Sequence, residues 1–178
     1  MDALTGEPGD GARAGTSRRV LVVLVAVLLL AADQLTKWLV VTHLSRGAFI
    51  RLAPFLKIKH TYNTGIAFGL WATGGKVLPA LAAACIIALL IWGSRYARHS
   101  ALVGWALALV VGGALGNMLD RIRLGHVIDF IDLSFWPVFN VADACVVVGA
   151  LLLLYHGLRW REPAGAAEIG LEADKEEV

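Results

Sequence analysis

The segment ALVGWALALVVGGALGNMLDR, residues 101–121, is a long apolar run that ends in a short polar tip. Its apolar part, residues 101–119, is close to the roughly 20 residues that an α-helix needs to cross the hydrocarbon core of a membrane. Gly112 and Gly116 have the GxxxG spacing, and small residues at such positions let helices approach closely in lipid. The segment therefore predicts a membrane-spanning helix that packs tightly against its neighbours.

The rest of the chain has the same apolar character. Of its 178 residues, 58% are hydrophobic and 17% are charged, whereas a typical soluble domain carries about 25% charged residues. The mean hydropathy is +0.69. Three further apolar runs lie at 20–41, 77–92 and 138–158. We therefore predict an all-α membrane protein, a bundle of four transmembrane helices. The net charge of +2 and the lack of a long basic run argue against nucleic acid as a partner.

The predicted transmembrane domain occupies residues 19–160 and lies between two polar tails. Residues 1–18 are rich in glycine, alanine and polar side chains and show no apolar period. Residues 161–178 are acidic. Segments of this kind bury too little apolar surface to fold. We expect both tails to be disordered and cytoplasmic.

Two parts of this domain need closer interpretation. The run that begins at Val20 resembles a cleavable signal peptide, but its apolar character resumes at Trp38, which favours a retained first helix. Residues 43–76 carry basic side chains and alternating pieces such as 55–59, which predict a small extracytoplasmic strand segment. Basic residues are divided almost evenly between the two sides, and the short basic turn at 93–100 favours cytoplasmic termini.

Polar side chains collect at the ends of the predicted helices, where ionisable groups are costly and are functional candidates by default. Asn117, Asp120 and Arg121 share one helix face because they are spaced i, i+3 and i+4. Asn140 and Asp143 share a face at the start of the fourth run. The last two spans are antiparallel and joined by a short connection, so we expect their polar ends to meet at one membrane surface.

Asp129 lies in that connection, within the apolar pentad VIDFI at 127–131. Asp33 and Lys37, on the first span, reach the same layer because a helix rises about 1.5 Å per residue. Two carboxylates that lie close together cannot both ionise cheaply, so one keeps its proton while the other acts as a base. An aspartic protease uses this division to activate water. The spacings alone leave open which two of the acids form such a pair; the candidates are Asp33, Asp120, Asp129, Asp132 and Asp143.

Most of these residues also have a purely structural interpretation. Asp33 and Lys37 are spaced as an i,i+4 ion pair. Asp120 and Arg121 would form a pair that orders the end of the third span. Asp132 has the position of an ordinary interfacial charge. Among these acids Asp129 is the hardest to explain structurally, because its neighbours are apolar.

The start of the fourth span offers a second structural alternative. Asn140 is suited to cap this helix, with Asp143 in the first turn near the positive end of the helix dipole. We keep this interpretation open beside the catalytic one.

Other chemistries have little support in the sequence. Cys85 and Cys145 lie in apolar runs without metal-binding spacing, so we expect no metal and no cofactor. The chain has no HExxH motif of a zinc protease and no GxSxG motif of a serine hydrolase. A transporter or channel subunit would spread its acids through the depth of the bilayer, and a structural scaffold would not need the pair.

The polar motifs together resemble those of bacterial lipoprotein signal peptidase, signal peptidase II. The motifs that carry the resemblance are ADQLTK at 32–37, NTGIAF at 63–68, GGALGNMLDR at 112–121, VIDF at 127–130 and FNVAD at 139–143. They occur in order and span residues 20 to 158. One motif alone is weak, but five together are highly specific.

The resemblance implies four transmembrane helices with a small extracytoplasmic β-cradle, and an active site near the outer face of the bacterial inner membrane. It implies cleavage of a prolipoprotein just before a diacylglyceryl-modified cysteine, without a metal, and inhibition by globomycin. Membrane lipid surrounds such an enzyme, and we expect a monomer.

The resemblance assigns catalysis to Asp129, in its VIDF motif, and to Asp143. We choose Asp129 over Asp120 as the partner of Asp143, also because of its apolar setting. Asp120 then orients Arg121. The residues implied to line the substrate pocket are Asn63, Asn117, Arg121 and Asn140, and those implied to stabilise the first helix are Asp33 and Lys37.

Overall fold

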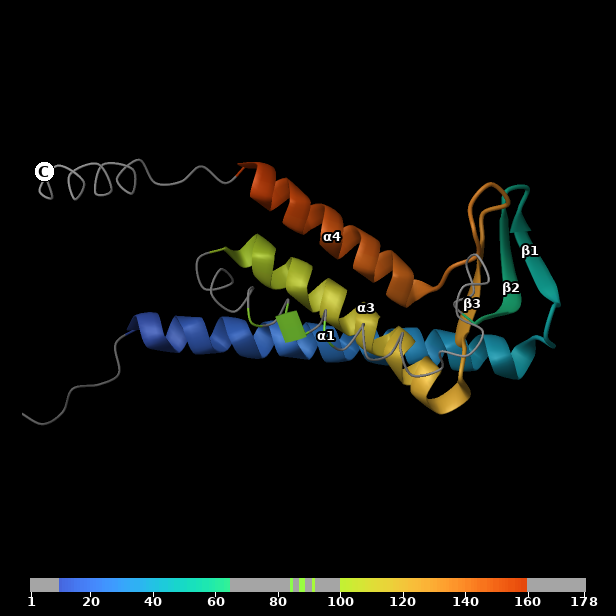
Figure 1. Cartoon of the computed structure of the whole chain (residues 1–178), viewed down its shortest axis with the longest axis horizontal. Coiled ribbons are helices and arrows are strands. Elements are labelled where there is room, and N and C mark those ends of the chain that lie inside the picture. Colours follow the sequence, from blue (N-terminus) through green and yellow to red (C-terminus); the bar gives the residue numbers. More distant parts are fainter. Residues whose placement is uncertain (1–9, 65–83, 85–86, 89–90, 92–99, 160–178) are drawn as a thin grey trace, which may run out of the picture.

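The computed structural model describes residues 10–64, 84, 87–88, 91 and 100–159. Within these residues, three long helices carry a three-stranded antiparallel sheet at one end (Figure 1). The helices are α1 (Asp10–His43), α3 (Ala101–Leu124) and α4 (Val141–Arg159). The strands are β1 (Phe49–Ala53), β2 (Leu56–Asn63) and β3 (Val127–Asp132). All three helices are long and apolar enough to cross a membrane.

Three of the four predicted spans are therefore confirmed as helices. The predicted span at 77–92 lies outside the described residues except for positions 84, 87, 88 and 91, which are helical. The four-helix bundle stays a prediction. The segments 1–9 and 160–178, which hold most of the two predicted tails, also lie outside the described residues.

The first helix begins earlier than the predicted boundary at residue 19. It starts at Asp10, so residues 10–18 are helical although they were predicted to be disordered. Extending an existing helix adds one hydrogen bond per residue without the cost of nucleation, so an apolar span can carry a polar extension.

Helix α3 packs between α1 and α4 and is the most buried of the described helices. At its start, the side chain of Ser100 accepts a hydrogen bond from the backbone N–H of Val103 at 3.5 Å. At its end, Gly125 adopts the left-handed conformation with φ of 76° and donates to the carbonyl of Arg121, as glycine does in many helix C-caps. These caps define the two ends of α3, and the cap at Gly125 fixes where its polar tip stops.

Close approach of the helices depends on glycines of α3, as its composition predicted. A Cβ added at Gly112 would lie 2.8 Å from the backbone oxygen of Ala26 in α1. A Cβ at Gly113 would collide with the backbone oxygen of Ala142 in α4. These two glycines bring both neighbouring helices against α3.

The predicted strand segment forms β1 and β2, which pair as a hairpin. The third strand was not predicted, because residues 127–132 were assigned to the connection between spans. They pair with β2 in antiparallel register, so that Thr61 lies opposite Asp129 and Asn63 opposite Val127. The sequence VIDFID is rich in β-branched and aromatic residues, which favour strands, but its partner lies more than sixty residues away along the chain.

The sheet lies where α1 and α3 end and where α4 begins (Figure 1). The start of α1 and the end of α4 both lie at the opposite end of the bundle. The polar tips of the helices and the strand that carries Asp129 are therefore gathered at one end of the molecule.

Candidate active site

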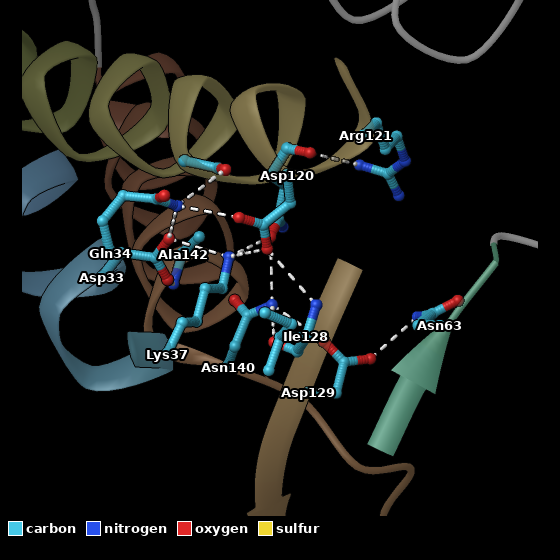
Figure 2. A network of polar contacts seen from close by, with 12 residues as sticks. Asp33, Gln34, Lys37, Asn63, Asp120, Arg121, Ile128, Asp129, Asn140 and Ala142 are labelled. Atoms are coloured by element: carbon cyan, nitrogen blue, oxygen red, sulfur yellow. Dashed lines mark hydrogen bonds and ion pairs between the residues drawn. The ribbon is translucent and has the colours of Figure 1, made fainter. Parts of the chain in front are cut away.

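A network of polar side chains joins the three helices to the sheet at this end (Figure 2). Its members come from α1, α3, α4, β2 and β3, and most of them are almost fully buried. Buried polar groups are costly unless each finds a partner, so their contacts define the site.

Lys37 forms the centre of the network on α1. Its Nζ lies 2.8 Å from Oδ2 of Asp33 and 2.8 Å from Oδ2 of Asp120, and it donates to Oδ1 of Asn117 at 3.0 Å. The predicted ion pair between Asp33 and Lys37 is confirmed. A buried lysine shared by two carboxylates has its three N–H donors satisfied, which is the condition for keeping its charge away from water.

Asp120 has a different partner from the one predicted. It contacts Lys37 rather than Arg121, and it also accepts from Nε2 of Gln34 at 2.9 Å and from the backbone N–H of Ile128 at 3.2 Å. Asp120 therefore ties α1, α3 and β3 together. The acid points inward because three donors meet it there, while the adjacent Arg121 donates to the carbonyl of Asn117 at 3.3 Å.

The start of α4 forms a reciprocal cap. Oδ1 of Asn140 accepts from the backbone N–H of Asp143 at 2.9 Å, and Oδ2 of Asp143 accepts from the backbone N–H of Asn140 at 3.1 Å. This is the capping-box arrangement. The structural interpretation of this pair is confirmed, and it places the carboxylate of Asp143 at the N-terminus of α4.

The side-chain amide of Asn140 reaches across to β3. Its Nδ2 donates to Oδ1 of Asp129 at 2.8 Å and to Oδ1 of Asn117 at 3.0 Å. Asn117 in turn donates from Nδ2 to Oδ1 of Asp143 at 2.7 Å. Two amides thus connect the carboxylates of Asp129 and Asp143 from two separate elements.

Asn63, at the end of β2, completes the surroundings of Asp129. Its Nδ2 donates to Oδ2 of Asp129 at 2.9 Å. Burial raises the pKa of Asp129 to about 6; the hydrogen bond from Asn63 opposes this rise and the negative charge of Asp143 adds to it. A carboxyl group with this pKa exchanges a proton near neutral pH, as general acid–base chemistry requires.

The structure thus brings most of the predicted site residues into one connected network. Gln34 was missed by sequence reasoning, although it follows Asp33 directly; its Nε2 contacts Asp120, Asp33 and the carbonyl of Gly116. Asp132 lies apart, with its Oδ2 4.0 Å from Nζ of Lys57. The described residues contain no group of three or more His, Cys, Asp or Glu side chains placed to hold a metal ion.

Known proteins are similar to this chain over the whole region that holds the network. A family model described as signal peptidase II matches residues 25–159. The lipoprotein signal peptidase of Symbiobacterium thermophilum is 40% identical over 143 residues, which cover 77% of this chain and 93% of that protein. The lipoprotein signal peptidase of Burkholderia thailandensis is also 40% identical over 143 residues, covering 76% of this chain and 86% of that protein.

The fold has relatives among solved structures as well. A bacterial membrane enzyme superposes with a TM-score of 0.75 at 30% sequence identity, covering 79% of this chain and 94% of that one. A second bacterial membrane enzyme structure superposes with a TM-score of 0.70 at 30% identity, covering 80% of this chain and 93% of that one.

Proposed function

This chain belongs to the signal peptidase II family, and we propose that it is an intramembrane aspartic endopeptidase. It removes the signal peptide from diacylglyceryl-modified prolipoproteins by cutting just before the modified cysteine. The observation that carries the proposal is the pair of amides, Asn117 and Asn140, that connects Asp129 with Asp143. Asn140 donates to both acids, through its side chain to Asp129 and through its backbone N–H to Asp143, and two acids joined in this way can share one proton and one water.

The proposed reaction begins with Asp129 protonated and Asp143 ionised, an assignment supported by the raised pKa of Asp129. Asp143 takes a proton from a water molecule while the oxygen of that water attacks the scissile carbonyl carbon. Asp129 gives its own proton to the carbonyl oxygen. The tetrahedral product then collapses: the C–N bond breaks, a carboxyl group forms, and the departing amine receives the proton that Asp143 had taken. A proton returned to Asp129 from the collapsing hydroxyl restores the starting state.

The proposed substrate contacts come from the polar side chains around the two acids. Asn63 and Asn140 hold Asp129, Asn117 holds Asp143, and Arg121 lies one helix turn beyond Asn117. We propose that these side chains orient a substrate backbone beside the carboxylates. The enzyme acts as a monomer in the bacterial inner membrane, with this end of the bundle near the extracytoplasmic face and with lipid around its helices.

Two isosteric variants test the catalytic assignment. Asp129→Asn and Asp143→Asn should each lower kcat on a diacylglyceryl-modified substrate by about 10²-fold or more, because a positioned acid or base contributes about 10²–10⁴. Asp132→Asn, on the same strand but partly exposed and 4.0 Å from Lys57, is the matched control and should keep near-normal turnover. Each protein must show a cooperative thermal transition in detergent. Near-normal turnover of either folded dyad variant would end the proposal.

A further inference from the structure

Lys37 lies on α1, which carries neither of the two proposed catalytic acids. Its side chain is only 2% exposed, and its three closest partners come from two helices. The family resemblance implies only a stabilising role for this lysine. Lys37 also contacts Asn117, and Asn117 donates to Asp143. Lys37 is therefore connected to one of the proposed catalytic acids.

The amide of Asn117 has a defined orientation. Its Oδ1 accepts from Nζ of Lys37 at 3.0 Å and from Nδ2 of Asn140 at 3.0 Å, while its Nδ2 donates to Asp143 at 2.7 Å. A flipped amide would place its NH₂ group against an ammonium and its oxygen against a carboxylate. Both contacts would be repulsive, since an ammonium has no acceptor and an ionised carboxylate has no donor. The Lys37 ammonium, together with the Asn140 amide, thus favours the orientation that presents an N–H to Asp143.

The influence of Lys37 extends to Asp129. Oδ1 of Asn117 receives the same Asn140 amide that donates to Asp129. While burial raises the pKa of Asp129, the positive charge of Lys37 is among the influences that lower it. One buried cation therefore acts on both members of the pair, through an amide in one case and through its charge in the other.

We propose that Lys37 is a positioning residue for hydrolysis: through Asn117 it fixes the donor that faces Asp143, in addition to holding α1 against α3. This inference rests on the proposed function, because it concerns the alignment of the two acids for attack on a peptide. A lysine that only stabilised the fold would change the amount of folded protein but not the chemistry of each folded molecule.

The test compares two variants that differ only at Lys37. Asp33→Asn is the reference, and Asp33→Asn/Lys37→Met removes the ammonium from it. The double variant keeps the net charge of the wild-type cluster, because one cation and one anion are lost together. Asp33 contacts neither acid of the pair. All proteins are assayed in detergent on a diacylglyceryl-modified substrate, with the folded fraction measured by thermal unfolding.

Asp33→Asn should lower the Tm and keep kcat per folded molecule within about threefold of wild type. The double variant should lose about 30-fold or more in kcat with KM within about threefold, since the lost interaction aligns the acids rather than binding substrate. Its pH–rate profile should also move to higher pH by about half a unit or more, because a nearby cation favours the ionised carboxylate. A double variant with the kcat and the pH profile of the reference would overturn the proposal.

A second variant keeps the proposal testable if the double variant does not fold. Lys37→Arg retains a cationic donor, so it should keep kcat within about tenfold of wild type and leave the pH profile in place. A folded Lys37→Arg protein would contradict the positioning role if its kcat fell about 30-fold or more. A fall of that size is on the order of the loss expected when the contact with the amide is removed. The dyad variants separate the two proposals. If Asp129→Asn and Asp143→Asn stay active, the proposed function fails, whereas inactive dyad variants with an unaffected Lys37 series overturn only the positioning role.

Discussion

At the scale of single residues, the two proposed catalytic acids differ in how they are held. Asp129 lies on a strand, is 2% exposed and receives two side-chain amides. Asp143 lies in the first turn of α4, where one backbone N–H and one side-chain amide meet it. The helix N-terminus favours a negative charge at Asp143, while the buried strand position favours a proton on Asp129. These different surroundings support the proposed division into an acid, Asp129, and a base, Asp143.

The raised pKa of Asp129 predicts a pH dependence of stability. Native Asp129 keeps its proton up to a pH of about 6, whereas an unfolded chain releases it near the ordinary value of 3.8. Between these values the native state binds more protons, so stability is lost as pH rises. Asp129→Asn cannot lose this proton. Its free energy of unfolding relative to wild type should therefore increase from pH 4 to pH 6 and level off above, by up to about 3 kcal/mol, and its Tm relative to wild type should rise in parallel.

Thermal unfolding of the two proteins in detergent across this pH range is the measurement. Taking the difference between them removes the contributions of all other titrating groups. A difference in Tm that stays constant from pH 4 to pH 8 would show that Asp129 titrates normally in the folded protein.

At the scale of elements, α3 determines the geometry of the site because its glycines set the distances between helices. A Cβ at Gly116 would lie 2.5 Å from Oδ2 of Asp33. Asp33 cannot move away cheaply, since it is held by Lys37 and by the backbone N–H of Ala142. The same glycine that permits close packing also leaves room for the buried ion pair.

Gly116→Ala should therefore destabilise the fold by about 1–3 kcal/mol, as overpacking of a rigid core does, and it should lower the Tm in detergent. Gly157→Ala in α4 is the matched control, because nothing lies within 4 Å of a Cβ added there. Its Tm should be unchanged or slightly raised, since alanine favours a helix over glycine. Equal Tm values for the two variants would exclude a packing role for Gly116.

The strand β3 is the other element that shapes the site. Asp129 is held in it by the pairing with β2, and the backbone N–H of Ile128 donates to Asp120 of α3. A flexible loop at this point would let the carboxyl group of Asp129 turn toward solvent. Pairing in a sheet instead keeps it buried beside Asn140 and Asn63.

At the scale of the whole molecule, the helices expose apolar side chains along their length, while the buried charged network lies at one end. Helices α1 and α4 expose large apolar side chains such as Leu28 and Leu158, which are 66% and 80% exposed. A soluble monomer rarely shows such continuous apolar surface, and lipid covers it at no cost. The buried charges, by contrast, lie at the end that carries the sheet (Figures 1 and 2).

The proposed extracytoplasmic position of the sheet end predicts how the two ends of the bundle are exposed in cells. Phe135, 76% exposed in the loop between β3 and α4, lies at the sheet end, and Arg159 closes α4 at the other end. In a Cys85→Ser/Cys145→Ser background, a membrane-impermeant maleimide added to spheroplasts should label Phe135→Cys. It should label Arg159→Cys only after permeabilisation. The reverse labelling pattern would place the proposed active site on the cytoplasmic side.

Much of the architecture and of the site follows from local features of the chain. The apolar runs predict α1, α3 and α4 because the requirement to span a bilayer depends only on length and composition. The spacings of Asp33 with Lys37 and of Asn140 with Asp143 predict their contacts because helical geometry makes such residues neighbours. The alternation in residues 55–59 predicts part of the hairpin for the same local reason.

Contacts between distant segments could not be determined in this way. The pairing of β3 with β2, the choice of Lys37 rather than Arg121 as the partner of Asp120, and the contact of Gln34 with Asp120 depend on how α1 and the sheet pack against α3. These partners are many tens of residues apart, so no periodicity relates them. The sequence by itself therefore determined which residues are polar within an apolar chain, and only the tertiary structure decided which of them meet, because a buried polar group takes the partner that packing brings within reach.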